Sequence, residues 1–357
     1  MESWHISPVS TFLQAMRFLI PLLYPFAVVY DAITTVRNRL YDRGVQRSAR
    51  FDVPVIGVGN LSVGGTGKTP MIEYLIRLLT PGIKVATLSR GYGRSSKGIR
   101  IAGDRDNAST IGDEPYQFYR KFKEKIVVAV GEERVLAIPH ILHEHPGTNA
   151  VLLDDAFQHR RVQPAFQILL TDYNNVFTQD YLLPAGRLRE SKRGARRADV
   201  IVVTKCPGNT TDDDMMEVEK AIRRYSSRPV FFTRIVYGNL LAVTEGSPYK
   251  PERIILVSGI ANPAPLEQYL RQDHDVIRHF SFRDHHVYSN KDMKVICETA
   301  ARENAVVVTT EKDMVRMDPE VFKRASIPLH YLPIEVEFLK NGKEFDEMVL
   351  NVVNSYA

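Results

Sequence analysis

The chain has 357 residues, of which 44% are hydrophobic and 25% are charged. This length predicts two domains, and the composition excludes a mostly disordered, collagen-like or multi-span membrane protein. The net charge of +5 is a mild bias toward anionic partners, and two cysteines, Cys206 and Cys297, form neither a disulfide framework nor a zinc-binding spacing. A reducing compartment is therefore predicted.

The first 50 residues differ from the rest. Residues 18–30 are an uncharged run of about 20 Å as a helix, shorter than the roughly 30 Å of a bilayer core. Pro21 and Pro25 are expected to interrupt that helix, so a full membrane span is not expected. Five arginines follow between positions 37 and 50. Two interpretations stay open: a segment lying on anionic lipid, or an ordinary N-terminal helix with a solvated basic face.

From residue 52, short β-branched runs alternate with helix-like stretches, which indicates βα units in a mostly parallel sheet. Predicted strands cover residues 54–59, 84–88, 125–130, 150–154, 167–171, 199–204, 253–258 and 305–310. The sequence therefore predicts an α/β fold with a parallel sheet between helices and a second, smaller α/β domain. The predicted parts are a membrane-associated helical segment (1–50), a larger domain (51–228), a two-stranded linker (229–245 and 330–340), a smaller domain (246–329) and a C-terminal helix (341–357).

A glycine-rich string between the first predicted strand and the next helix is nearly a Walker A phosphate-binding loop. Its residues are Ser62, Val63, Gly64, Gly65, Thr66, Gly67, Lys68 and Thr69. Backbone N–H groups can turn toward a polyphosphate, Lys68 can reach the β- and γ-phosphates, and the Thr69 hydroxyl can bind Mg²⁺. The usual motif opens with Gly, whereas this loop opens with Ser62. The loop predicts a P-loop, kinase-like larger domain.

Two aspartates, Asp154 and Asp155, follow an apolar strand and match the carboxylates that hold the metal in P-loop proteins. With Thr69 they form the predicted Mg²⁺ site. The guanine-reading string Asn-Lys-x-Asp is missing, because residues 204–207 have Pro where its Asp would be. ATP is therefore the predicted nucleotide.

Three further strings are weak individually. Residues 112–115 predict a helix start with Asp113 as N-cap, and residues 282–288 contain two adjacent histidines that point in different directions. The stretch from 183 through Arg197 is rich in arginine, which is most simply a solvated basic face.

Together these strings resemble one family, the lipid A 4'-kinases, over nearly the whole chain. The strings are residues 59–70, 89–94, 112–115, 153–159, 183–190, 284–286 and 310–313. The resemblance implies transfer of a phosphate from ATP to the 4' hydroxyl of a tetraacyldisaccharide 1-phosphate, the precursor of lipid A. It also implies peripheral or monotopic attachment to the cytoplasmic face of the bacterial inner membrane.

Residue by residue, the resemblance implies that Asp113 acts on the sugar hydroxyl with His285 as its partner. Asp154 and Asp155 would serve the metal, and the further active-site positions would be Gln158, Arg189 and Glu190. The implied partners are the acylated glucosamine disaccharide 1-phosphate and an anionic membrane surface, with no nucleic acid and no obligate protein partner.

Two other classes of protein also fit parts of this sequence. A nucleotide-dependent switch or membrane-targeting ATPase fits the motifs before Gly112 equally well, but it needs no base directed at a sugar. A nucleic-acid-binding domain rests only on the charge of +5 and lacks a recognised module.

Overall fold

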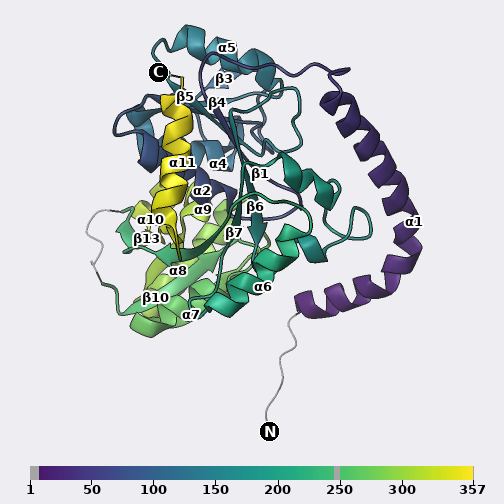
Figure 1. Cartoon of the computed structure of the whole chain (residues 1–357). Coiled ribbons are helices and arrows are strands. Elements are labelled where there is room, and N and C mark those ends of the chain that lie inside the picture. The colour runs from purple at the N-terminus through teal and green to yellow at the C-terminus, as the bar shows by residue number, and fades with distance from the viewer. Residues whose placement is uncertain (1–7, 245–249, 357) are drawn as a thin grey trace. The chain divides into compact units, whose positions relative to one another are not determined.

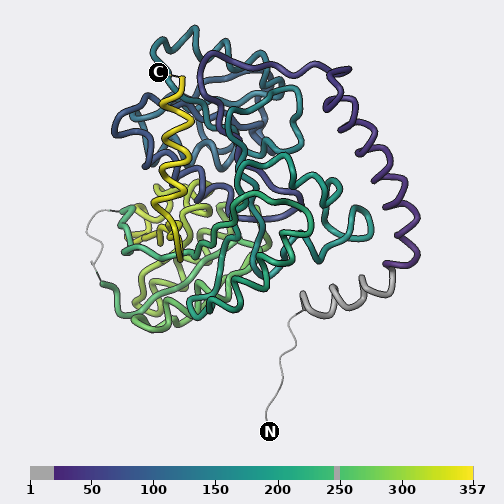
Figure 2. Tube along the Cα trace, viewed as in Figure 1, coloured from purple at the N-terminus to yellow at the C-terminus, as the bar shows by residue number. Residues whose placement is uncertain are grey.

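The structure is a computed structural model that describes residues 8–244 and 250–356, with side chains from residue 20 onward (Figures 1 and 2). Residues 1–7, 245–249 and 357 of the predicted domains lie outside the described part. The chain divides into two compact units. Unit 1 comprises residues 1–72, 149–234 and 338–357, and unit 2 comprises residues 73–148 and 235–337.

Unit 1 contains a parallel sheet whose central strands are mostly apolar and buried, while β8 is buried only in its first half. In sheet order they are β8 (Val230–Tyr237), β7 (Val200–Thr204), β6 (Phe166–Asp172), β1 (Val55–Asn60) and β5 (Ala150–Asp154). Every residue of β1 and β7 is buried, as expected for central parallel strands. Most of the strands predicted from the sequence match these to within a residue or two.

The segments that connect the strands of unit 1 are helices in some places and long loops in others. The helices are α1 (Pro8–Asp42), α2 (Lys68–Leu79, which continues into unit 2), α6 (Asp212–Arg223) and α11 (Gly342–Asn354). Residues 155–165 join β5 to β6 without a helix, and only the short 3-10 helices η2 (Phe177–Gln179) and η3 (Lys192–Arg197) interrupt residues 173–199. The predicted site residues after position 154 therefore lie on long loops.

α1 is one helix of 35 residues, seen as the long purple coil of Figure 1. The expectation that Pro21 and Pro25 interrupt it is wrong, because the helix continues through both. The two prolines are four residues apart and both exposed. Each proline removes one backbone N–H donor from the helix, and the remaining hydrogen bonds of the 35-residue helix are sufficient to keep it continuous.

Unit 2 contains a second set of strands. β2 (Val85–Ser89) pairs parallel to β4 (Ile126–Val130), which pairs antiparallel to β3 (Arg100–Ile101). A separate five-stranded sheet has the order β11 (Asp275–Ser281), β10 (Arg253–Ser258), β12 (Val306–Thr310), β13 (Leu329–Leu332) and β9 (Leu241–Ala242). All its pairings are parallel except β13 with β9.

Some helices of unit 2 begin after a polar residue whose side chain caps the first turn. The helices of this unit are α3 (Ala108–Ile111), α4 (Asp113–Phe122), α5 (Arg134–Glu144), α7 (Ala264–Asp273), α8 (Asn290–Glu303), α9 (Glu311–Met314) and α10 (Pro319–Arg324), with the 3-10 turn η1 (Lys123–Lys125). Ser289 and Asp292 form a capping box at α8. The prediction that Asp113 is an N-cap is wrong: Gly112 is the N-cap, and Asp113 is the first helical residue, with its side chain directed elsewhere.

The chain passes from unit 1 to unit 2 within β8 and returns near the end of β14 (Ile334–Phe338), which lies beside β8 in the sheet. Leu339 N–H donates to the Phe232 carbonyl at 2.9 Å, and Gly238 N–H donates to the Pro333 carbonyl at 2.9 Å. The linker and domain limits inferred from the sequence stay predictions.

Each unit has its own hydrophobic core. In unit 1, Leu169, Ile201 and Phe177 are buried under the long β6–β7 connection, and in unit 2, Val307 and Phe322 anchor a core beneath α8 and α10. No helix among the described residues combines the length and apolar character needed to cross a membrane. The predicted α/β class with a parallel sheet is confirmed.

Candidate functional site

The glycine-rich loop lies between the end of β1 and the start of α2. Gly64 and Gly67 have φ angles of 111° and 79°, which side chains with a Cβ rarely adopt. Two side chains at the end of β7 hold the loop by its carbonyls. Thr204, the last residue of the strand, donates its hydroxyl to Thr66 O at 2.9 Å, and the ammonium of Lys205, the next residue, donates to Gly65 O. Lys205 also pairs with Asp172 at 3.0 Å. Lys205 was not among the predicted site residues, and no motif in the sequence points to this contact.

Lys68 begins α2 and points toward Asp155, the residue after β5. Its Nζ lies 3.5 Å from Asp155 Oδ1 and 3.4 Å from Asn60 Oδ1. Arg189 donates to both oxygens of the same carboxylate at 2.8 Å and also to the Asn60 side chain. Two cations thus converge on one carboxylate, an arrangement that concentrates positive charge beside the loop. Asn60, the last residue of β1, was not predicted.

The predicted metal ligands Thr69, Asp154 and Asp155 offer hard oxygen atoms, the ligands that Mg²⁺ prefers. Among the described residues, no group of three or more His, Cys, Asp or Glu side chains is placed to hold a metal ion. Mg²⁺ in nucleotide sites is commonly held by one or two carboxylates together with phosphate oxygens and waters. The residues therefore fit such an ion, because the carboxylate of Asp155 already attracts two cations.

Glu190 and Gln158 form a second, more buried group in unit 1. Glu190 is 3% exposed and accepts from Asn38 at 2.8 Å, from Gln158 at 2.9 Å and from Arg197 at 2.9 Å. Gln158 Nε2 also donates to the Asn60 carbonyl at 2.9 Å. Because both oxygens of Glu190 accept hydrogen bonds, its carboxylate connects α1, the loop after β5 and the loop before η3.

α1 is attached to this group along its second half. Tyr30 donates its hydroxyl to Arg189 O at 2.9 Å, and Arg37 donates to Gln158 O at 2.6 Å. Ala27 and Thr34 are buried on the same side of the helix. Large apolar side chains elsewhere on α1 are 52–68% exposed: Leu22, Tyr24, Phe26, Val28, Val29, Ile33 and Val36.

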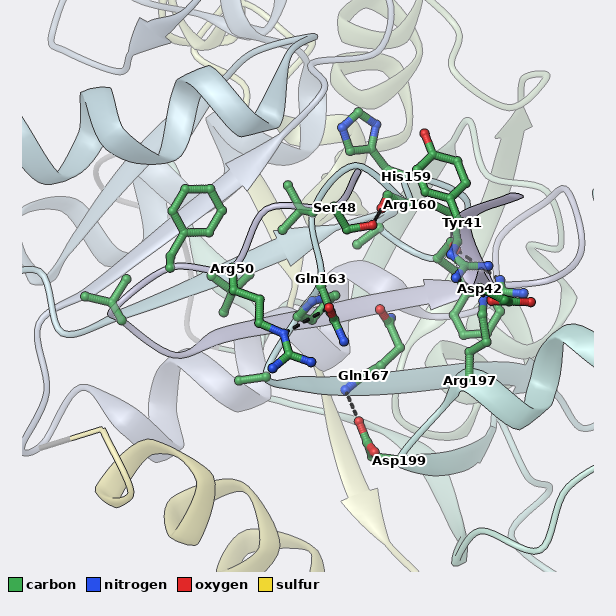
Figure 3. Close-up of a pocket in the computed structure, with 18 of the residues that line it drawn as sticks. Tyr41, Asp42, Ser48, Arg50, His159, Arg160, Gln163, Gln167, Arg197 and Asp199 are labelled. Atoms are coloured by element: carbon green, nitrogen blue, oxygen red, sulfur yellow. Dashed lines mark hydrogen bonds and ion pairs between the residues drawn. The ribbon is translucent and has the colours of Figure 1, made fainter. Parts of the chain in front are cut away.

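A cavity of about 710 Å³ lies in unit 1 away from the glycine-rich loop (Figure 3). Its lining mixes both charges, from the end of α1, the loop after β5 and the residues before β7: Asp42, Arg50, His159, Arg160, Arg197 and Asp199. Arg160 pairs with Asp42 at 2.7 Å, and Asp199 accepts from the backbone of Gln167 at 2.9 Å. Most of these charges thus have partners inside the protein.

The basic stretch from Arg187 to Arg197 is only partly a solvated face. Arg187 pairs with Asp180 at 3.1 Å, and Lys192 donates to Thr178 O at 2.7 Å. Burial lowers the pKa of Lys192 below its usual range. Arg193 and Arg196 are exposed and form no ion pair within the described part of the chain.

In unit 2, Asp113 and His285 come together although 172 residues separate them. Asp113 Oδ2 lies 3.1 Å from His285 Nδ1 and accepts from Arg316 Nε at 2.7 Å. The Asp113 side chain is 20% exposed, and its place at the start of α4 favours a negative charge. His285 has a left-handed backbone with φ of 58°, unusual for a residue with a Cβ and often found at functional sites.

Arg316 was missed in the sequence, although it lies close to the predicted 310–313 string. Its guanidinium is 4% exposed and also donates to Asp313 Oδ1 at 3.1 Å. Asp313 is fully buried and accepts from Gly259 N–H at 2.9 Å and from the Thr310 hydroxyl at 2.6 Å. This chain of bonds fixes the guanidinium that holds Asp113.

The second histidine, His286, has a partner different from that of His285. His286 lies 3.2 Å from Asp292 at the start of α8 and stacks on Phe282. Unit 2 also buries two carboxylates around one ammonium: Lys121 contacts Glu73 at 2.6 Å and Glu311 at 2.8 Å. Burial, with the charge of Glu73 added, raises the pKa of Glu311 to about 7, although Lys121 opposes the rise.

Of the predicted residues, the structure brings together the loop Ser62–Thr69, Asp155, Gln158, Arg189 and Glu190 in unit 1. It brings together Asp113 and His285 in unit 2. Their roles in a reaction stay proposals.

Comparison with known proteins gives concordant matches. A family model described as tetraacyldisaccharide-1-P 4'-kinase matches residues 19–354. A tetraacyldisaccharide 4'-kinase of Flavobacterium johnsoniae is 43% identical over 344 residues, covering 95% of this chain and 98% of that protein. One of Bacteroides thetaiotaomicron is 43% identical over 352 residues, covering 93% and 92%. The crystal structure of LpxK from Aquifex aeolicus in complex with ATP matches with a TM-score of 0.75 and 29% identity, covering 94% of this chain and 99% of that one.

Proposed function

Because the chain belongs to the tetraacyldisaccharide-1-P 4'-kinase family and is a kinase of that kind, we propose that it transfers the γ-phosphoryl group of ATP to the 4' hydroxyl of an acylated glucosamine disaccharide 1-phosphate. The observation that carries the mechanism is the Asp113–His285 pair. A nucleotide-dependent switch needs no carboxylate aimed at an alcohol, whereas phosphoryl transfer to a sugar does.

Asp113 is the base in this proposal, and its two oxygens have different tasks. Both Arg316 Nε and His285 Nδ1 lie against Oδ2. Oδ1 has no hydrogen-bond partner in the part of the chain that the structure describes. Oδ1 therefore takes the proton of the sugar hydroxyl as the new P–O bond forms, while Oδ2 keeps the carboxylate oriented.

The nucleotide residues supply positive charge rather than covalent chemistry. Backbone N–H groups of the glycine-rich loop and the start of α2 bind the phosphates, and Lys68 faces the β- and γ-phosphates. Arg189, already beside Lys68 on Asp155, adds a second cation for the transferred group. Mg²⁺, held by Thr69, Asp154 and Asp155, would neutralise the charge that develops on the phosphate oxygens.

Gln158 and Glu190 act as positioning residues in the proposal. Gln158 holds the carbonyl of Asn60, whose side chain contacts Lys68 and Arg189. Glu190 in turn holds Gln158. Their loss is expected to misplace the two cations rather than to remove a reacting group.

The substrate is a lipid, and α1 offers a surface for it. Leu22, Phe26, Val29, Ile33 and Val36 are spaced four, three, four and three residues apart, so they share one face of the helix, and all are exposed. Arginines follow at the end of the helix. We therefore propose peripheral attachment to an anionic membrane, on the cytoplasmic face of the inner membrane, with this stripe dipped into the headgroup region.

Replacing Phe26 and Ile33 with Ser tests the attachment. Each apolar side chain contributes about 1.5 to 3 kcal/mol when buried, so sedimentation with phosphatidylglycerol vesicles should weaken at least tenfold. Val295→Ser, at a similarly exposed valine on α8, is the control and should sediment like the unmodified protein. Equal sedimentation of all three proteins would contradict the role of the stripe.

The function itself is tested by incubating the purified protein with γ-labelled ATP and the tetraacylated disaccharide 1-phosphate in detergent. Label is expected in the lipid and not in added protein or nucleic acid. Hydrolysis of ATP that is unchanged by the lipid, with no label in it, would instead indicate a nucleotide-dependent switch.

A further inference from the structure

The imidazole of His285 lies between two basic side chains as well as beside Asp113. The ammonium of Lys312 is 3.1 Å from Nε2, and Arg316 Nη2 is 3.3 Å from Nδ1. Lys312 belongs to α9 and Arg316 follows it, so both come from one segment of unit 2. The established partner of the ring, Asp113, lies on α4.

The donor and acceptor capacities of these groups determine where the ring proton lies. An ammonium can only donate, and an ionised carboxylate can only accept. Nε2 must therefore offer its lone pair to Lys312, and Nδ1 must carry the hydrogen that it donates to Asp113 Oδ2. A neutral imidazole has one nitrogen of each kind, so this arrangement satisfies both contacts.

We propose that Lys312 is a positioning residue that fixes the Nδ1–H tautomer of His285 by donating to the lone pair of Nε2. The proposal deepens the proposed kinase function and rests on it for its consequence. An imidazolium beside Asp113 would draw the carboxylate charge toward itself and weaken its capacity to take the sugar proton. A neutral ring orients Asp113 without that loss.

The other groups around the ring are consistent with this assignment. Asp284 holds the Lys312 ammonium at 2.9 Å, and its nearest oxygen is 3.9 Å from Nε2. Burial raises the pKa of Asp284, but the hydrogen bond and charge of Lys312 outweigh it, and the net pKa lies below the usual range. Arg316 Nη2 lies 3.3 Å from Nδ1 and can only donate, so it competes with Asp113 for that nitrogen. Asp113 Oδ2 is nearer, at 3.1 Å, and takes the Nδ1 hydrogen, while Arg316 binds the same carboxylate oxygen through Nε at 2.7 Å. Tyr92 contributes only a ring edge at 6.5 Å between centroids.

The backbone around His285 contributes to the same placement. The His285 N–H donates to Asp284 Oδ1 at 3.0 Å, the same oxygen that contacts Lys312. One carboxylate therefore orients both the left-handed residue that carries the ring and the ammonium that faces it. This is why Lys312, 27% exposed in its side chain, can keep a defined position.

The test uses the full-length protein with ¹⁵N-labelled histidine, and long-range ¹H–¹⁵N spectra that distinguish a protonated from an unprotonated ring nitrogen. His285→Gln identifies the signals. In the unmodified protein at pH 8, Nδ1 is expected to be protonated and Nε2 unprotonated. A ring with the proton on Nε2 instead would overturn the assignment, and this measurement needs no variant of Lys312.

Lys312→Met then tests the role of the ammonium. Without it no donor faces Nε2, so the spectra at pH 8 should show a substantial share of rings with the proton on Nε2. Lys312→Arg keeps a cationic donor and should restore the original behaviour. In Lys312→Met, kcat should fall while KM for ATP stays within twofold. An unchanged tautomer in Lys312→Met would overturn the proposal.

The outcomes separate this proposal from the kinase function. The ring spectra require no substrate, so the expected spectra without label transfer to lipid would refute the proposed reaction and leave the assignment of the tautomer standing. Label transfer with the opposite tautomer would refute only the role of Lys312.

Discussion

Two carboxylates, Asp155 in unit 1 and Asp113 in unit 2, are each held by basic side chains, but from different distances along the chain. Asp155 is contacted by Lys68 and Arg189, which are 87 and 34 residues away. Asp113 is contacted by His285 and Arg316, which are 172 and 203 residues away. In unit 1 the glycine-rich loop itself is a local motif and its neighbours come from moderate distances along the chain, whereas the proposed base is created by the packing of more distant segments.

This difference predicts that substitutions around Asp113 and around Asp155 affect different kinetic constants. The largest effect is expected from Asp113→Asn, which removes the proton acceptor but keeps the side-chain shape. Turnover should fall by about 10² to 10⁴, while the affinity for ATP, measured by calorimetry, should stay within twofold. Asp273→Asn, at an exposed carboxylate of unit 2, is the control. Near-native turnover of Asp113→Asn would show that another group takes the proton.

Lys68→Ala is the counterpart in unit 1. It should raise KM for ATP by about tenfold or more and also lower kcat, because the ammonium contacts the phosphates in both the ground state and the transition state. Steady-state kinetics with varied ATP measures both, and Lys220→Ala, an exposed lysine of α6, should change neither. A change confined to KM for the lipid would contradict the role proposed for the glycine-rich loop.

A smaller effect, on stability, is expected at the buried carboxylates of unit 2. Because the pKa of Glu311 is raised to about 7 in the folded protein, its contribution to stability is complete below about pH 4.5 and is lost as the pH rises through 7. Glu311→Gln should therefore gain stability relative to the unmodified protein between pH 5 and pH 8, by roughly 1 to 3 kcal/mol.

Thermal unfolding at each pH measures this difference, and Glu298→Gln, 64% exposed, provides the control. A difference between the two proteins that does not vary with pH would mean that Lys121 keeps Glu311 ionised throughout.

The smallest effect is expected at the basic stretch of unit 1. Neutralising Arg193 and Arg196 to Gln should raise KM for the lipid about two- to fivefold with kcat nearly unchanged, since exposed charges attract an anionic substrate only weakly. Lys220 of α6 and Arg224, the residue after that helix, are both exposed and, neutralised together, are the matched control. If both pairs gave the same KM as the unmodified protein, the stretch would be an ordinary solvated surface.

The difference between the two regions also explains which site residues could be predicted from the sequence. The loop from Ser62 to Thr69 could be predicted because its proposed role depends on eight successive residues and largely on their own backbone. Arg316 was missed, because its role depends on α9 lying against α4 and on Asp313 being buried beneath it. Lys205 and Asn60 were missed for the same reason: each acts on a segment that is distant in the sequence or leaves no repeated spacing.

The amino-acid pattern by itself determined the α/β class, most of the strands and the phosphate-binding loop, since these depend on hydrophobic periodicity and on glycine conformation within short stretches. Only the tertiary structure decided that α1 continues through two prolines, that Asp113 starts a helix rather than capping it, and which cations face Asp155, Asp113 and His285. The physical reason is that hydrogen bonds and ion pairs between distant segments are set by burial and packing, which no local spacing records.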